Sequence, residues 1–220
     1  MDALLRELKP IGSFRTISKG GNVLFPGEGP RSVMVVRSGI IRAYTITSSG
    51  EERTVSLHGD GDVLPLTWAL GVTNNSLFYY EAVTDCRVFQ VSKTAFNDYL
   101  SDDPGRLRSM LDYSVNLYTS LLLRITGLEQ SRAVEKIGFT LYYLVLTRGK
   151  ETSPGTFRID VRLSHALFGS LVGLTRESTA KNMKILRDKK IIDYASFTYT
   201  VNKSKLEAFL GEDGFRDLEV

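Results

Sequence analysis

The stretch SHALFGSLVGLTRESTAKNMKILRDK, residues 164–189, decides the fold of the C-terminal part of the chain. It contains two short helical runs with apolar residues on one face, namely Leu167, Phe168 and Leu171 in the first and Thr179, Met183 and Leu186 in the second. Gly169 permits close contact between the two helices, and Gly173 tolerates the positive φ of a tight turn. The stretch therefore predicts a helix-turn-helix.

The second of these helices presents side chains suited to reading DNA. Thr175 is a good N-cap, so the first turn would project Arg176, Glu177, Ala180 and Lys181 away from the core. Arginine bonds bidentately to guanine and glutamate accepts from cytosine, and both pairings belong to the major groove. The simpler alternative is a solvent-exposed ion pair between Glu177 and Lys181.

Charge and a second motif support the same partner. Residues 132–210 carry 14 Lys/Arg against 7 Asp/Glu, whereas residues 1–131 carry 13 against 14. The runs 191–194 and 198–201 predict a β-hairpin beside the second helix, which makes the motif a winged helix. A basic face that is merely solvated remains the alternative explanation of the charge.

In the N-terminal part of the chain, apolar residues recur with a different period, that of β-strands. From Phe14 to Val91 short alternating runs are broken by glycine, and residues 48–51 have hairpin chemistry. This pattern predicts an antiparallel β-barrel or jelly roll, with one short helix near residues 66–70.

A long helix follows Pro104. Apolar residues recur there at alternating spacings of four and three around Ser114, namely Leu107, Leu111, Tyr118, Leu121, Ile125 and Leu128. We expect a coiled-coil dimer interface on this seam, the alternative being a helix packed on its own barrel. A further helix is expected over residues 133–148, with Gly149 ending it.

Several classes are excluded by composition. No run approaches the roughly 20 apolar residues that span a bilayer, so we expect a cytoplasmic protein that does not bind membranes. The single cysteine and two histidines argue against a metal centre or an iron–sulfur cluster, and no cofactor is expected. No nucleophile–histidine pair, P-loop or dinucleotide fingerprint is present, so an enzyme is not expected.

Taken together, these motifs resemble the cyclic-AMP receptor protein/FNR (Crp-Fnr) family of bacterial transcription regulators. The resemblance rests on Gly27-Glu28, Gly39, Gly50-Glu51-Glu52, Gly61-Asp62 and residues 172–178, VGLTRES. It implies an α+β fold with a cyclic-nucleotide-binding-like β-barrel (1–103), a dimerisation helix and hinge (104–131) and a winged helix-turn-helix (132–220).

The resemblance also implies a set of DNA-contacting residues and partners. Arg176, Glu177 and Lys181 match the base-reading face, which suggests a palindromic site with TGTGA-like half-sites, and Ser164, His165 and Thr175 match phosphate-contacting positions. The full expected set is Ser164, His165, Thr175, Arg176, Glu177, Ser178, Ala180, Lys181 and Lys184. The implied partners are double-stranded DNA, a second copy of the chain and RNA polymerase.

The sequence departs from the family where cyclic nucleotides are held. Without gaps, Pro65-Leu66 stands where a Gly-Glu would contact the ribose, and Ser76-Leu77 where an Arg-Ser or Arg-Thr would hold the phosphate. Because a buried phosphate without its arginine is costly, we expect no tight binding of cyclic AMP.

The effector is therefore a different molecule, or none. Aromatic residues in this region, Trp68, Phe78, Tyr79 and Tyr80, either belong to the barrel core or line, with Leu66, a pocket for an apolar effector. His58 is expected to lie in a loop rather than to bind haem. The rival function is a sensor or interaction module whose winged helix contacts protein instead of DNA.

Overall fold

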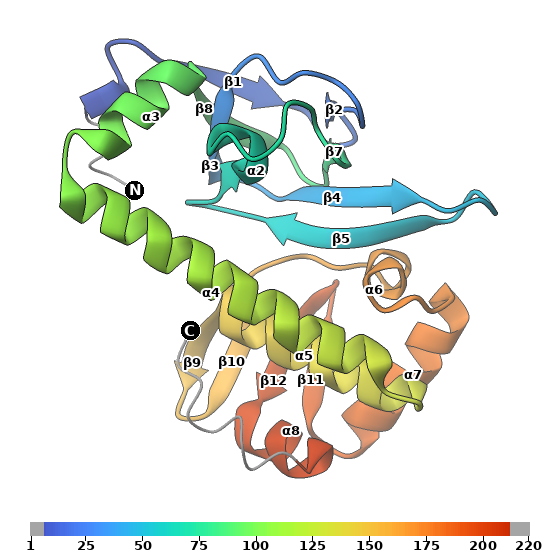
Figure 1. Ribbon diagram of the computed structural model, residues 1–220. Helices are drawn as coiled ribbons and strands as arrows, with labels where there is room; N and C mark the ends of the chain where they lie inside the picture. The colour runs from blue at the N-terminus through green and yellow to red at the C-terminus, as the bar shows by residue number, and fades with distance from the viewer. Residues whose placement is uncertain (1–6, 212–220) are drawn as a thin grey trace. The chain divides into compact units, whose positions relative to one another are not determined.

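The computed structural model describes residues 7–211, which form two compact units divided between Asp112 and Tyr113. The first unit is rich in β-structure and the second contains the helix-turn-helix, with the long helix α4 running across the division (Figure 1). This order of elements confirms the α+β architecture expected from the sequence. No helix of the described range is long and apolar enough to cross a membrane.

Two four-stranded sheets make up the first unit. One contains, in order, β1 (Ser13–Ile17), β8 (Cys86–Val91), β3 (Val33–Ser38) and β6 (Val63–Leu64). The other contains, in order, β2 (Asn22–Leu24), β7 (Tyr79–Ala82), β4 (Ile41–Ile46) and β5 (Glu52–His58). All strand pairs in both sheets are antiparallel, as the alternating runs predict.

Side chains from both sheets share one core. Met34 and Val36 of β3 and Val88 of β8 pack with Ile41 and Ala43 of β4, all nearly inaccessible to solvent. The two sheets therefore form the layered jelly roll that the sequence indicates. The short helix α2 (Leu66–Ala69) and helix α3 (Lys93–Ser101) follow β6 and β8.

Two glycines allow the turns of this unit. Gly50, with φ of 81°, closes the β4–β5 hairpin, where the Thr47 amide donates to the Glu51 carbonyl over 2.9 Å. At Gly39, with φ of 85°, a Cβ would lie 2.3 Å from the Asp85 carbonyl oxygen. At position 39, space as well as backbone conformation therefore excludes every residue that has a side chain.

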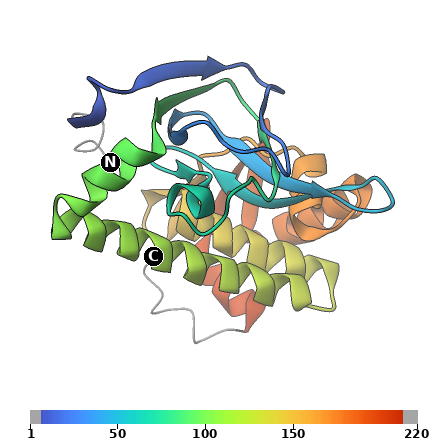
Figure 2. The same cartoon turned by 45° about the horizontal axis from the view of Figure 1, so that its top comes forward.

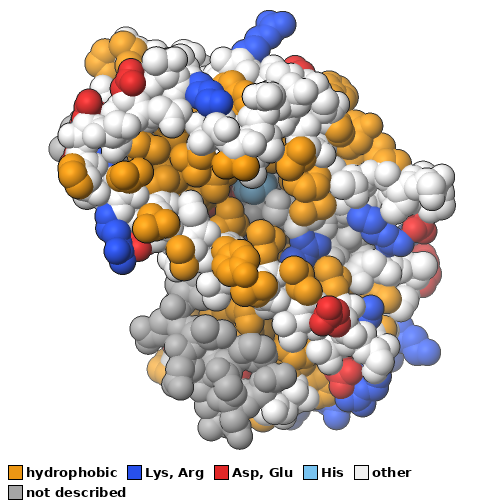
Figure 3. Space-filling model, in the orientation of Figure 1, with side chains coloured by type: hydrophobic (Ala, Val, Ile, Leu, Met, Phe, Trp, Pro, Cys, Tyr) orange, Lys and Arg blue, Asp and Glu red, His pale blue; other side chains and the backbone are white. Residues whose placement is uncertain are grey.

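Helix α4 spans Pro104–Glu129 and is continuous (Figure 2). Large apolar side chains along it are exposed, and hydrophobic atoms gather along its course in Figure 3. The most exposed are Leu107, Leu111, Val115, Tyr118, Leu122 and Ile125. Leu121 and Leu128, which the expected seam includes, are half-buried, so the exposed face differs in part from that seam.

The second unit is organised around helix α5 (Ala133–Arg148), whose residues 137–145 are all buried. The helix packs against helices α6 (His165–Val172), α7 (Arg176–Asp188) and α8 (Lys203–Leu210) and against the sheet. That sheet contains, in order, β11 (Ile192–Ala195), β12 (Thr198–Asn202), β10 (Thr156–Ile159) and β9 (Gly149–Ser153). Burial on every side explains why α5 is more apolar than one core-facing stripe requires.

Candidate nucleic-acid interface

Helices α6 and α7 form the helix-turn-helix with the roles that the sequence assigns to its glycines. Gly173 ends α6 in the left-handed conformation, with φ of 72°. At Gly169 a Cβ would lie only 2.5 Å from the Leu174 carbonyl oxygen and 3.0 Å from Thr179 Oγ1. The close crossing of the two helices therefore depends on the absence of a side chain at position 169.

Both helices begin with a side-chain cap. Ser164 Oγ accepts from the Leu167 amide over 3.2 Å at the start of α6, and Thr175 Oγ1 accepts from the Ser178 amide over 3.1 Å at the start of α7. These bonds satisfy amides that would otherwise lack a partner in the first turn. The N-cap expected at Thr175 is thus present in the structure.

Burial along α7 separates a core face from an outer face. Thr179, Met183 and Leu186 are fully buried, as the sequence predicts. The outer face consists of exposed Arg176, Glu177, Lys181 and Lys184, together with half-buried Ser178 and Ala180. Within residues 7–211 no ion pair joins Glu177 to Lys181, so the surface-pair alternative has no counterpart in the structure.

The N-terminus of α6 lies beside α7 and the wing. His165 packs edge to face on Tyr194 of β11, with ring centroids 5.5 Å apart, and the Arg187 guanidinium of α7 lies 5.0 Å from the Tyr194 ring. Burial, and then the positive charge of Arg176, lower the pKa of His165. The imidazole of His165 is therefore neutral at neutral pH, close to the positive charge of Arg176.

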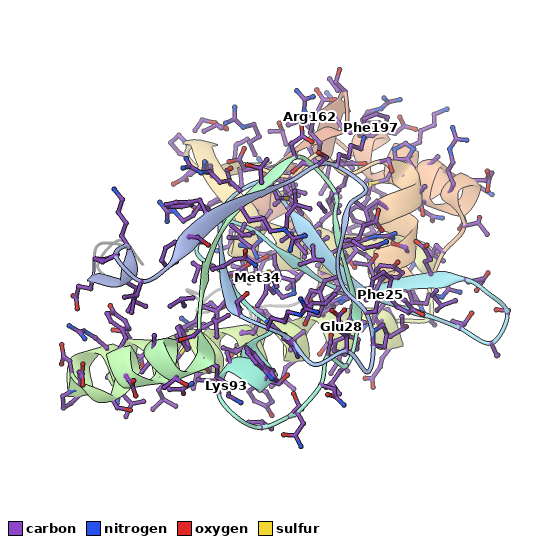
Figure 4. The ribbon with its side chains drawn as sticks, turned by 90° about the horizontal axis from the view of Figure 1, so that it is seen from above. Phe25, Glu28, Met34, Lys93, Arg162 and Phe197 are labelled. Atoms are coloured by element: carbon purple, nitrogen blue, oxygen red, sulfur yellow. The ribbon has the colours of Figure 1, made fainter. Side chains whose placement is uncertain are left out.

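The wing is fixed to the segment that precedes α6. The Leu163 amide donates to the Phe197 carbonyl and Tyr199 Oη donates to the Leu163 carbonyl, both over 3.0 Å. Phe197, at the wing turn, has φ of 66° and an exposed ring, and Figure 4 labels it beside Arg162. The wing thus forms one surface with the start of α6.

An open groove of about 220 Å³ lies at the base of this wing, a feature that the sequence analysis did not identify. Its wall includes the exposed Arg158 and Arg162 and the half-buried Thr198. The groove also contains Asp160, whose carboxylate accepts from Lys150 over 2.6 Å, and this bond lowers the pKa of Asp160. The two arginines therefore leave the groove with a net positive charge.

A buried arginine connects α4 with the helix-turn-helix. Arg124 Nη2 donates to the Leu171 carbonyl near the end of α6 over 2.9 Å, and burial lowers the pKa of the guanidinium. The bond fixes α6 against the last turns of α4, which also present the exposed Leu122 and Ile125.

The residues considered for an effector pocket lie in different surroundings. Tyr80 lies in the core between the sheets, and burial raises its pKa to about 12. Tyr79, its neighbour in β7, points to the opposite face and stacks on Tyr44 at 5.1 Å. Phe78 packs against the core, and Trp68, like Leu66 half-buried, lies 5.0 Å from Lys93 Nζ.

The positions that lack the nucleotide anchors have structural roles of their own. Ser76 is buried and its hydroxyl donates to the Phe78 carbonyl over 2.8 Å.

The expectation that His58 lies in a loop is wrong, because this residue pairs with Ile41 as the last residue of β5. It is buried, and its Nε2 lies 2.7 Å from Ser56 Oγ. Hydrogen bonding along the strand extends β5 beyond the point where the following glycines suggest a loop.

Comparison with known families identifies both units. The family described as "Cyclic nucleotide-binding domain" matches residues 14–103, and the family described as "Crp-like helix-turn-helix domain" matches residues 135–209. Within the described part of the chain, no cluster of three or more histidine, cysteine or acidic residues is arranged to hold a metal ion.

Curated relatives and solved structures agree with these matches. The Global nitrogen regulator of Synechococcus elongatus is 25% identical over 201 residues, which are 87% of this chain and 89% of the relative. The Fumarate and nitrate reduction regulatory protein of Vibrio cholerae is 24% identical and covers 96% of this chain and 81% of its own. The structure of FixK2 from Bradyrhizobium japonicum has the same fold, with a TM-score of 0.75, 18% identity and coverage of 90% and 96%.

Proposed function

This chain belongs to the Crp-Fnr family of transcription regulators, and on that basis we propose that it reads a palindromic DNA site with helix α7. Members of this family bind DNA through the helix-turn-helix and act as dimers. The finer proposal is that the half-sites resemble TGTGA and that base pairs are read by Arg176, Glu177 and Lys181.

The observation that carries this proposal is the outer face of α7. Arg176 and Glu177 occupy its capped first turn, and both are exposed. Arg176 can bond to O6 and N7 of one guanine while Glu177 accepts from N4 of a cytosine. Lys181 carries a single ammonium group and cannot form a bidentate fork, so its position should discriminate less sharply.

Contacts to the phosphate backbone would fix the register of α7. Thr175, Ser164 and His165 lie at the starts of the two helices, where free amides and hydroxyls favour anions. Ser178, Ala180 and Lys184 would line the same groove of the duplex. We add Arg158 and Arg162, because the groove that they line continues this surface towards flanking phosphates.

The exposed face of α4 is proposed as the dimer interface. Six large apolar side chains along one 26-residue helix would be costly to leave in water, and a second copy of the helix would cover them. Such a dimer places its two recognition helices in successive major grooves, about 34 Å apart. We retain residues 104–131 as the dimerisation segment between a sensor domain (1–103) and a DNA-binding domain (132–220).

Further partners follow from this role. We propose that the protein acts in the cytoplasm on promoters used by RNA polymerase, by binding rather than by catalysis. It responds to a molecule other than a cyclic nucleotide, or to no effector, since neither Leu66 nor Ser76 supplies a charge for ribose or phosphate.

Fluorescence anisotropy tests the proposal directly. The protein is titrated into a labelled duplex with two TGTGA half-sites and, as a control, into a duplex of the same composition with both half-sites scrambled. We expect tighter binding to the first duplex and a steep loss of affinity for both as salt rises, because bound phosphates release counterions. Equal and salt-insensitive binding to both duplexes would contradict a role in reading DNA and favour a protein-binding module.

A further inference from the structure

A small cavity opens from the jelly-roll core, and none of the aromatic residues named above lines it. It has a volume of about 80 Å³ and is lined by residues of β1, β2, β3, β8 and the loop between β2 and β3. The residues that matter are Arg15, Arg31, Ser32 and Gln90 at the mouth and Leu24 and Met34 on the floor. Figure 4 labels Met34 and also Glu28 of the loop.

Strand register places these groups on one face. Gln90 of β8 lies opposite Ser13 of β1 and Met34 of β3, and Arg15 follows Ser13 by two residues. Since side chains alternate along a strand, Arg15, Gln90 and Met34 share the face that carries the core. The cavity therefore begins in the core and ends at charged side chains.

The polar rim is suited to an oxyanion. Gln90 Nε2 donates to Ser32 Oγ over 3.1 Å, which leaves the Ser32 hydroxyl hydrogen available to a ligand. Among the described residues, neither Arg15 nor Arg31 makes an ion pair or a hydrogen bond through its guanidinium group. Glu28 also lines the cavity, and its Oε2 already accepts from the Phe25 amide over 3.1 Å. The rim thus keeps a net positive charge, and guanidinium groups bind carboxylates bidentately.

The floor and the size define the rest of the ligand. Leu24 and Met34 are only 5% and 3% exposed and belong to the hydrophobic core. An apolar floor favours a ligand with a hydrocarbon portion over a purely inorganic anion. A cavity of about 80 Å³ is far below the roughly 300 Å³ at which sites for drug-sized ligands begin, so a nucleotide does not fit.

The wall of the cavity is joined to the segment that holds cyclic nucleotides in relatives of this fold. The Gly27 amide donates to the Ser76 carbonyl over 2.9 Å, and the Ser76 amide donates to the Glu28 carbonyl over 2.8 Å. A ligand that orders the loop at Glu28 therefore also orders the chain at Ser76. This connection gives the cavity a route by which occupancy changes the sensor unit.

We propose that this cavity binds a small organic carboxylate as the effector, with its head on the two arginines and its short apolar tail against Met34. The binding step stands on the cavity alone, and only the step from occupancy to DNA affinity rests on the proposed function.

The test uses butyrate as the probe and butyramide as its neutral counterpart of equal size. Each is titrated into the full chain by calorimetry, with thermal unfolding as a second readout and ionic strength held constant. Butyrate should bind at millimolar concentration and raise the unfolding midpoint, whereas butyramide should do neither. Arg15→Gln and Arg31→Gln should each weaken butyrate binding at least tenfold, because each removes a charge-assisted hydrogen bond. Arg87→Gln is the matched control, since Arg87 lies on β8 outside the cavity, 4.2 Å from the ring of Phe14.

Several results would overturn the proposal. Equal responses to butyrate and butyramide, or equal butyrate binding by the wild type and both cavity variants, would show that the two arginines do not bind the carboxylate. Inorganic phosphate that binds as tightly as butyrate would show that the apolar tail of the ligand contributes nothing to binding. If butyrate binds without changing the affinity of the protein for the operator duplex, the ligand is not an effector. Because the titration contains no DNA, its failure is distinct from a failure of operator reading by α7.

Discussion

Substitution of Gly169 by alanine tests the helix-turn-helix geometry, and its effect can be worked out from the structure. The new Cβ would lie 2.5 Å from the Leu174 carbonyl oxygen, about 0.9 Å closer than the 3.4 Å at which ordinary contact begins. This oxygen belongs to the backbone and cannot rotate away. The Leu174 amide, moreover, donates to the Gly169 carbonyl over 2.9 Å and holds the two segments together.

Two opposing effects set the magnitude. Alanine in place of glycine inside a helix stabilises it by about 1 kcal/mol. Overpacking costs about 1–3 kcal/mol, and we take the upper end because a backbone atom has to move. Gly169→Ala should therefore lower the free energy of unfolding by about 2 kcal/mol, and the forced separation of α6 from α7 should weaken DNA binding as well.

Urea unfolding followed by circular dichroism measures this change. With a typical slope for a unit of this size, the midpoint should fall by roughly 1 M. Fluorescence of Trp68, the only tryptophan, reports the first unit and should change less. Ser170→Ala, one residue further along α6, removes a hydroxyl that donates to the Leu167 carbonyl over 2.8 Å but adds no atom, and should cost no more than about 1 kcal/mol. If Gly169→Ala proved as stable as the wild type, or more stable, the close crossing of α6 and α7 would be refuted.

Three further predictions concern the cap, the dimer and the sensor unit. Thr175→Ala removes the cap bond to the Ser178 amide and should cost about 1 kcal/mol of stability, weakening binding to specific and random duplexes alike; a loss confined to the specific duplex would contradict this. The double substitution Tyr118→Glu and Ile125→Glu changes side chains that are 62% and 51% exposed, so it should yield folded monomers by light scattering; a wild type that is itself monomeric at micromolar concentration and still binds DNA tightly would exclude the interface. Cyclic AMP should give no saturable micromolar isotherm in calorimetry, because Leu66 and Ser76 carry no charge; such an isotherm would show that another side chain, for example that of Arg87, holds the phosphate.

Local patterns predicted the helix-turn-helix well. Gly169, Gly173 and Thr175 act within a few residues of their partners, so spacing alone is enough to assign them. The exposed face of α4 was predicted less well: the strict alternation of four and three selects Leu121, while the structure exposes Leu122 and Val115. An undistorted helix has 3.6 residues per turn, and its exposed face drifts away from a 3.5-residue repeat.

Features that depend on strand register could not be predicted from the sequence. The cavity brings Arg15 of β1 together with Gln90 of β8, far along the chain, and the pairing of β1, β8 and β3 places both on one face, beside Arg31 of the loop that precedes β3. The choice between core and pocket for Tyr79 and Tyr80 depends on register too, because adjacent strand residues point to opposite sides, and the structure places Tyr80 in the core.

Selection from randomised duplexes, performed with the wild type, Arg176→Ala and Lys189→Ala, tests the central claim most directly. Lys189 caps the other end of α7, so its removal changes the charge of the helix equally without touching the first turn. The wild type and Lys189→Ala should recover the same palindrome. Arg176→Ala should lose about 1–3 kcal/mol on that site and relax the preference for guanine. Recovery of no palindrome by the wild type, or an unchanged base preference in Arg176→Ala, would contradict the role of α7 in the major groove.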